Sequence, residues 1–314
     1  MLKTRNPRLN HPRTGSPLWL ATIACILAIP ATSLPAQDLP EHEKIGYNLL
    51  ESVSKAPLPF TGEDTDFSID IKPKLSDFLH ESYVRLPIEF EYSFTNKREG
   101  TIGLIPYLPN PFDSDAVSSD GYFTFGLKQR IDDMLDGRFS LAAGFDGKIP
   151  LEEIPSPLLR ESYDQYMPYL TAAYALDRRN RWLAYSTFQY SWVGKDRREN
   201  RTPVDDPPSL AIFQPGIIYQ PQGEFRYGLS FEYKTDRLDG GSDDGLKIVP
   251  SVTWFPPEGT PYFRRLVGHF EITLDLEYDL SQIEEEEYGS DFGVGLSVRW
   301  RLNRAKPPPE ESVL

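Results

Sequence analysis

Histidine, the residue most often used for acid–base catalysis, is scarce in this sequence. Outside an amino-terminal segment described below, only His42, His80 and His269 are present. His269 is followed by Phe270 and Glu271 rather than by a serine that could act as a nucleophile. No nucleophile and base stand in a recognisable motif along the chain. We therefore predict no catalytic residues, and that the protein is not an enzyme.

Acidic residues are abundant, and their densest run is Glu284-Glu-Glu-Glu287. Several carboxylates together can hold a hard cation such as calcium. The run lacks the spaced ligands and the turning glycine of a dedicated calcium loop, so we favour a solvated loop, and the same holds for Asp205-Asp206 and Asp243-Asp244. A glycine-rich phosphate loop is also missing from the sequence. We predict no bound metal and no cofactor.

The most informative charged residues alternate with apolar ones between His269 and Leu280. Glu271, Asp275 and Glu277 fall on one face of an extended chain, and the intervening apolar residues fall on the other. A helical period would spread the carboxylates around the whole cylinder. The pattern therefore predicts a β-strand with one charged and one apolar face. Alternation alone fits a soluble sheet equally well.

Segments 83–95, 223–235 and 290–302 separate polar from apolar residues in the same way. Buried charges must be paired or hydrated, so the polar faces either line water or form cross-strand ion pairs. Both interpretations stay open: a charge-lined channel, or a lumen closed by its own salt bridges. The residues that we expect to line the lumen are Arg85, Glu89, Glu91, Arg226, Glu232, Glu271, Asp275, Glu277, Arg299 and Arg301, and the same face includes Lys128, Arg130 and Lys247.

Repetition along the chain favours a membrane barrel over a soluble sheet. From residue 66 onward, alternating segments are separated by polar breaks rich in Pro, Gly and Asp. Short breaks alternate with longer ones, except that residues 256–267 are long where a short turn is expected. Short turns on one side and long loops on the other are typical of transmembrane β-barrels. We predict an all-β fold, an antiparallel transmembrane β-barrel of about 12 strands. The expected strands are 66–73, 83–95, 100–108, 120–131, 137–147, 164–177, 181–193, 209–220, 223–235, 245–255, 268–280 and 290–302.

Two tryptophans on one face mark the expected height of the membrane. Trp182 and Trp192 share the apolar face of segment 181–193. At about 3.3 Å per residue and a tilt of about 40°, they are separated vertically by roughly 25 Å, the height of a lipid-facing band. Two tryptophans in a soluble core are the alternative. We expect Trp182, Trp192 and Trp300 to be aromatics at the lipid interfaces.

Composition and the amino terminus are consistent with export. The chain of 314 residues has a net charge of −14, a mean hydropathy of −0.45 and 13% aromatic residues. Such an acidic chain is a poor partner for nucleic acid. Residues 1–36 have a basic start, an apolar run from Leu18 to Ile29 and a cleavage site after Ala36, which predicts a signal peptide; an uncleaved anchor is the alternative. The one cysteine, Cys25, lies in that segment.

The remaining chain divides into three parts. Residues 37–65 are polar, and we predict a periplasmic leader there, with a short plug as the weaker alternative. Residues 66–302 form the predicted barrel. Residues 303–314 form a carboxy-terminal tail that includes Pro307-Pro-Pro309.

The signal peptide, the succession of strands and the ending Phe292-Gly-Val-Gly-Leu-Ser-Val-Arg-Trp-Arg-Leu302 resemble bacterial outer-membrane barrels. Within these, residues 66–302 look most like transporters related to proteins of phenol-degradation (MetA-pathway) operons. The resemblance implies an outer-membrane location, contacts with outer-membrane lipids and with the barrel-insertion machinery, and passage of small apolar or aromatic solutes. The chain departs from such barrels because Trp300 is not terminal. A structural or binding barrel with a closed lumen, or a secreted soluble β-protein, is the alternative.

Overall fold

The computed structural model describes residues 56–62, 65–134, 138–152, 162–177, 181–196, 207–221, 224–241, 244–256, 269–280 and 292–302. The predicted signal peptide, most of the predicted leader, the acidic run at 284–287 and the tail at 303–314 lie outside these residues. The described residues all belong to one compact unit.

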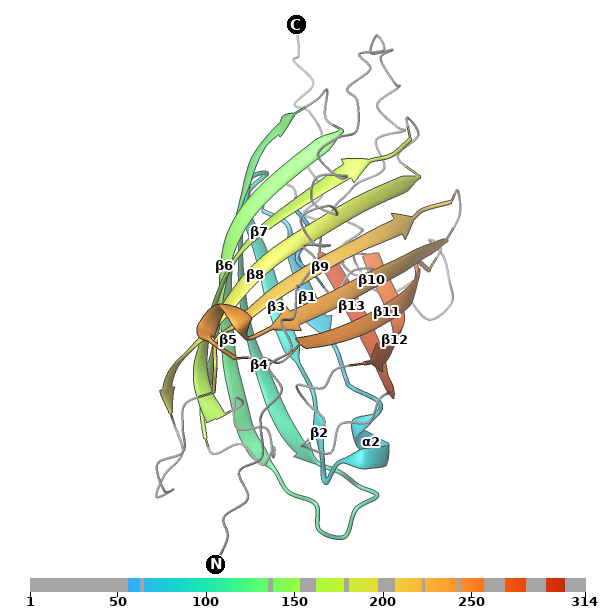
Figure 1. The fold of residues 1–314 in the computed structure, drawn as a ribbon. Helices are drawn as coiled ribbons and strands as arrows, with labels where there is room; N and C mark the ends of the chain where they lie inside the picture. The colour runs from blue at the N-terminus through green and yellow to red at the C-terminus, as the bar shows by residue number, and fades with distance from the viewer. Residues whose placement is uncertain are drawn as a thin grey trace, which may run out of the picture. The chain divides into compact units, whose positions relative to one another are not determined.

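In the described part of the chain, thirteen β-strands form a single antiparallel sheet. Figure 1 shows its arrangement. The first part of the sheet contains β1 (Phe67–Ile71), β2 (Tyr83–Arg85), β3 (Ile88–Thr95), β4 (Arg98–Pro109), β5 (Ser119–Met134) and β6 (Phe139–Pro150). The strands that follow are β7 (Tyr163–Ala175), β8 (Trp182–Asp196), β9 (Leu210–Tyr219), β10 (Phe225–Thr235), β11 (Asp244–Trp254), β12 (His269–Asp279) and β13 (Phe292–Leu302). Every predicted segment corresponds to a strand or, in one case, to two.

The sheet closes on itself because its first and last strands pair. β1 lies between β3 and β13, with Phe67 opposite Leu302 and Ile71 opposite Val298 on the β13 side. Each of the other strands from β4 to β12 pairs with the strands before and after it. The closed antiparallel barrel predicted from the sequence is confirmed.

One predicted strand is interrupted. Segment 83–95 is divided into β2 and β3 at Leu86-Pro87, because proline has no backbone N–H to donate to the ladder. Both halves pair with β4 in the same register, since Arg85 faces Tyr107 and Ile88 faces Leu104. β2 and β3 therefore share one position, and the barrel has the predicted 12 positions.

A short helix, α2 (Asp77–His80), follows β1 and lies beside β2 (Figure 1). The Asp77 carboxylate accepts hydrogen bonds from the Arg85 guanidinium at 2.8 and 2.6 Å. The Asn110 side-chain amide donates to the backbone carbonyl of Glu81 at 2.6 Å. These contacts fasten the helix to β2 and to the β4–β5 connection. A one-turn 3-10 helix, η4 (Arg237–Asp239), begins the β10–β11 connection.

Candidate solute passage in the barrel interior

The two faces of the sheet differ in kind, as alternation requires. Along β8, Leu183, Tyr185 and Thr187 are buried inside the barrel, whereas Trp182 and Trp192 on the outer face are 40% and 39% exposed. The outer face of β10 and β12 is likewise apolar and exposed. It presents Phe225, Tyr227, Leu229, Phe231, Tyr233, Leu274, Leu276 and Tyr278. The outer face therefore exposes apolar side chains to the surroundings of the barrel.

The predicted interface aromatics all lie on this outer face and stack on neighbours across the strands. Trp182 stacks on Tyr219 with ring centroids 4.3 Å apart. Trp300, which is half-buried, stacks almost parallel to Phe270 at 5.8 Å. Trp192 packs against Tyr166 at 6.0 Å.

The predicted interior residues of β12 and β13 form ion pairs on the inner face. Arg301 donates through Nε to Glu271 Oε1 at 2.8 Å, and both side chains are buried. Arg299 donates through Nε and Nη2 to Asp70 Oδ2 at 3.1 and 2.9 Å, and its Nη1 lies 3.9 Å from Glu91 Oε2. Asp275 is buried directly opposite Gly295. Charged residues of the first and last strands therefore meet where β1 pairs with β13, which we call the β1–β13 seam.

This seam includes two residues that the sequence analysis did not name, Asp70 and Lys72. Lys72 Nζ lies 2.6 Å from Glu89 Oε2 and 3.2 Å from Asp70 Oδ2. The signal was present in β1 and the residue after it, where Ser68, Asp70 and Lys72 alternate with apolar residues. It was weak because β1 has only 5 residues. Lys128 forms a second buried pair with the unpredicted Glu99, at 2.7 Å.

The remaining predicted residues are dispersed around the barrel. Arg85 binds Asp77 of α2, as described above. Arg226 lies near the short β9–β10 turn, donating to the Phe225 carbonyl at 2.9 Å, with its guanidinium 5.1 Å from the Phe255 ring. Glu232 and Glu277 line a small cavity.

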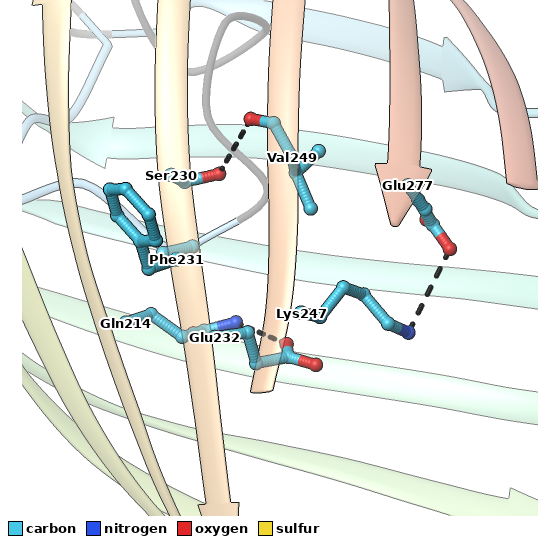
Figure 2. Close-up of a pocket in the computed structure, with 8 residues that line it drawn as sticks. Gln214, Ser230, Phe231, Glu232, Lys247, Val249 and Glu277 are labelled. Carbon is cyan, nitrogen blue, oxygen red and sulfur yellow. Dashed lines mark hydrogen bonds and ion pairs between the residues drawn. The ribbon is translucent and has the colours of Figure 1, made fainter. Parts of the chain in front are cut away.

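That cavity, about 60 Å³ in volume, lies against β9 to β12. Figure 2 shows Glu232 accepting a hydrogen bond from Gln214 Nε2, and Lys247 Nζ directed at Glu277. The two interactions measure 2.6 and 3.8 Å. Lys247 also lies 3.4 Å from Asp279, and Lys234 lies 3.1 Å from Glu232. A space of this size holds a few waters or one small solute group among charges of both signs.

Residues 56–62, from the end of the predicted leader, lie against the inner face of the barrel, as the plug alternative requires. Leu58 is 0% and Phe60 is 2% exposed, and both belong to a buried apolar cluster. The wall residues of that cluster come from β7, β8 and β9; they are Ala173, Ala175, Leu183, Tyr185 and Ile218. No sequence periodicity could predict this placement, because the segment forms no strand.

The described residues contain no group of three or more His, Cys, Asp or Glu side chains placed to hold a metal ion. His269 is exposed at the start of β12, opposite Arg301. Within the described part of the chain, no helix is both long and apolar enough to span a membrane.

Comparison with known proteins shows likeness in fold only. No protein-family model matches the chain, and no curated protein sequence matches it. A solved structure of the NanC porin aligns with a TM-score of 0.48 and 7% identity, covering 76% of this chain and 100% of that one. The KdgM porin aligns at 0.46 and 10%, covering 76% and 99%. The CymD monoaromatic hydrocarbon channel aligns at 0.39 and 8%, covering 83% and 94%.

Proposed function

We propose that this chain is an outer-membrane barrel through which small solutes pass passively, without a catalytic step. One observation carries the proposal, namely that the closed sheet is apolar and exposed outside but polar and ion-paired inside. A soluble barrel has the opposite arrangement, because its apolar residues fill the interior and its charges meet water. A closed sheet can also enter lipid without an unpaired strand edge.

In this arrangement the outer aromatics contact lipid, and Trp182, Trp192 and Trp300 lie near its interfaces. The charged inner residues line the path of the solute. Outer-membrane lipids and the barrel-insertion machinery are then the expected partners. Cell fractionation tests the location, since the protein should remain in the membrane fraction and migrate differently on a gel before and after heating. Recovery in the aqueous fraction would favour a secreted soluble protein.

A closed barrel with a structural or binding role is the second candidate, and two observations favour it. The inner charges are extensively paired, and residues 56–62 occupy part of the interior. Swelling of liposomes that contain the purified protein separates the two candidates. Uptake of neutral sugars up to a size limit is expected of a channel. Absence of uptake at every size would leave the closed barrel.

The substrate class that the sequence resemblance implies, small apolar or aromatic molecules, is a finer proposal. The apolar wall of β7 to β9 supports it, because it gives a largely polar interior a surface that an apolar group can contact. The measurement compares the rates at which an aromatic alcohol and a sugar of similar size enter liposomes through the protein. Faster entry of the sugar would argue against this substrate class.

A further inference from the structure

The segment Ala56-Pro-Leu-Pro-Phe-Thr-Gly62 lies in the barrel without joining its hydrogen-bond ladders. Pro57 and Pro59 have no backbone N–H, so the segment cannot pair as a strand in the usual way. It is therefore held by side-chain contacts and by a few specific hydrogen bonds. A binding site holds a ligand by the same kinds of interaction, namely side-chain contacts and a few specific hydrogen bonds.

Two threonines bind the backbone carbonyl of Pro57. Thr171 Oγ1 lies 2.7 Å and Thr187 Oγ1 lies 2.9 Å from this oxygen, and the two hydroxyls lie 2.9 Å from each other. Each hydroxyl has one proton, so the three oxygens share two donated protons. Both threonines are 0% exposed. The wall thus presents a buried pair of donors to one acceptor oxygen.

The apolar part of the site surrounds this pair of donors. Leu58 and Phe60 cover the wall formed by the cluster residues of β7, β8 and β9. A second buried apolar cluster, formed by Tyr83, Tyr107 and Tyr122, lies on β2, β4 and β5. The other buried polar side chains of the sheet are hydroxyls, charged groups and amides, so the β7–β9 patch differs in chemistry from most of its surroundings. The two hydroxyl donors and the apolar wall around them together suit a ligand that has an apolar group next to a carbonyl oxygen.

The other end of the segment is attached differently. Thr61 Oγ1 donates to the carbonyl of Asn96 at 2.6 Å, and the Gly62 N–H donates to Glu99 Oε2 at 3.2 Å. Asn96 follows β3 and Glu99 belongs to β4, so this attachment lies on a different part of the wall. Residues 57–60 and residues 61–62 are thus held by separate parts of the wall.

We propose that the β7–β9 patch with Thr171 and Thr187 is a solute-binding site, occupied in this structure by residues 57–60 acting as an internal ligand. Its external ligand is a solute with an apolar group beside a carbonyl oxygen, the chemistry of a short apolar peptide. Binding of this solute displaces the segment and frees the lumen. The proposal rests on the channel function proposed above.

The first test measures access to the segment. Leu58→Cys and the exposed Phe112→Cys provide matched thiols, since the two side chains are 0% and 81% exposed. The probe is the peptide acetyl-Pro-Leu-Pro-Phe-amide, and acetyl-Pro-Asp-Pro-Asp-amide is its control. Labelling by a maleimide should be at least tenfold slower at position 58. The apolar peptide should accelerate labelling at 58 and leave 112 unchanged.

The second test measures conductance in planar bilayers. Thr171→Val and Thr187→Val keep the side-chain volume and remove the donors, so each should shorten the closed periods and accelerate labelling of Leu58→Cys. The Leu58→Asp, Phe60→Asp variant, which abolishes the internal ligand, should stay open with or without the apolar peptide. Heat-modifiable gel mobility identifies which variants are folded.

The outcomes separate this inference from the channel proposal. If folded variants conduct but neither labelling nor closed periods respond to the peptide or to the threonine substitutions, the internal ligand is a fixed part of the wall and the inference is wrong. If no variant conducts, including the one with both aspartates, the channel proposal itself fails.

Discussion

Glu271 and Arg301 bind each other across β12 and β13 inside the barrel, 2.8 Å apart and both buried. A buried pair of this kind is costly to break from one side, because the remaining charge is left buried without its partner. A lone exposed pair contributes little, because water and salt screen it. This difference can be measured.

We expect Glu271→Gln and Arg301→Gln each to lower the free energy of unfolding by about 3–5 kcal/mol, and the double variant to lose less than the sum of both. Urea unfolding in detergent or liposomes provides the measurement. Arg237→Gln, at the mostly exposed pair with Asp244, is the control and should cost about 0–1 kcal/mol. Additive losses at 271 and 301 would show that the two side chains do not interact.

Ion selectivity should follow the acidic residues of β12. Exchanging Glu271, Asp275 and Glu277 for neutral amides removes negative charge from the proposed path while keeping side-chain size. The reversal potential in a salt gradient should then shift away from cation preference. Asp115→Asn removes an exposed charge from the β4–β5 connection and should have a smaller effect. An unchanged potential in the triple variant would mean that ions do not pass these side chains.

Gly121 should tolerate no side chain. It has a φ of +68°, and a Cβ there would lie 1.8 Å from the Ile105 carbonyl oxygen, where the pairing of β4 with β5 shifts register. Gly240 is a matched control, because its φ is +87° and a Cβ there meets nothing within 4 Å. Both alanine variants carry backbone strain of about 1–2 kcal/mol, because an L side chain is disfavoured at positive φ. Gly121→Ala should lose clearly more in urea unfolding, and equal losses would rule out the collision.

Asp177 should make the β7–β8 turn sensitive to acid. Burial alone would raise the pKa of this carboxyl, but the N–H groups of Trp182 and Arg181 and the Arg181 guanidinium donate to the carboxylate and hold the pKa below its ordinary value. A depressed pKa stabilises the folded state above the unfolded pKa of about 3.9, and that stabilisation disappears as the pH falls through the folded pKa.

The urea midpoint of the wild type should therefore exceed that of Asp177→Asn at pH 6, and the difference should shrink toward pH 3. Arg181→Gln keeps the carboxylate and removes one donor, so its pH dependence should be intermediate. A constant difference at all pH values would mean that the charge of Asp177 is not what stabilises the turn.

The strands could be predicted from the sequence because their signals are local. In β12 and β13 a period of two separates the faces, and the polar breaks end each strand. This information places Glu271 and Arg301 on one face. It does not pair them, because the pairing depends on the register between strands, which only the folded sheet defines.

Contacts between distant parts of the chain were beyond the sequence for the same reason. Asp70 and Arg299 are separated by 229 residues, and nothing in either neighbourhood identifies the other. Leu58 and Phe60 are apolar residues in a segment without periodicity, so their burial depends on a wall built more than 100 residues later. The division of β2 from β3 at Pro87 could have been predicted, because proline has no backbone N–H to donate. The regular alternation of polar and apolar residues around Pro87 favoured a single strand instead.

The pairing of β1 with β13 also constrains how the barrel is made. A chain that has not yet produced β13 leaves β1 and β12 with unpaired edges, which hydrocarbon does not tolerate. Contacts of such large sequence separation form slowly, since a long loop must close before they contribute. In the membrane location proposed above, we therefore expect insertion to follow synthesis of β13, because only then can the five residues of β1 pair with it and close the wall.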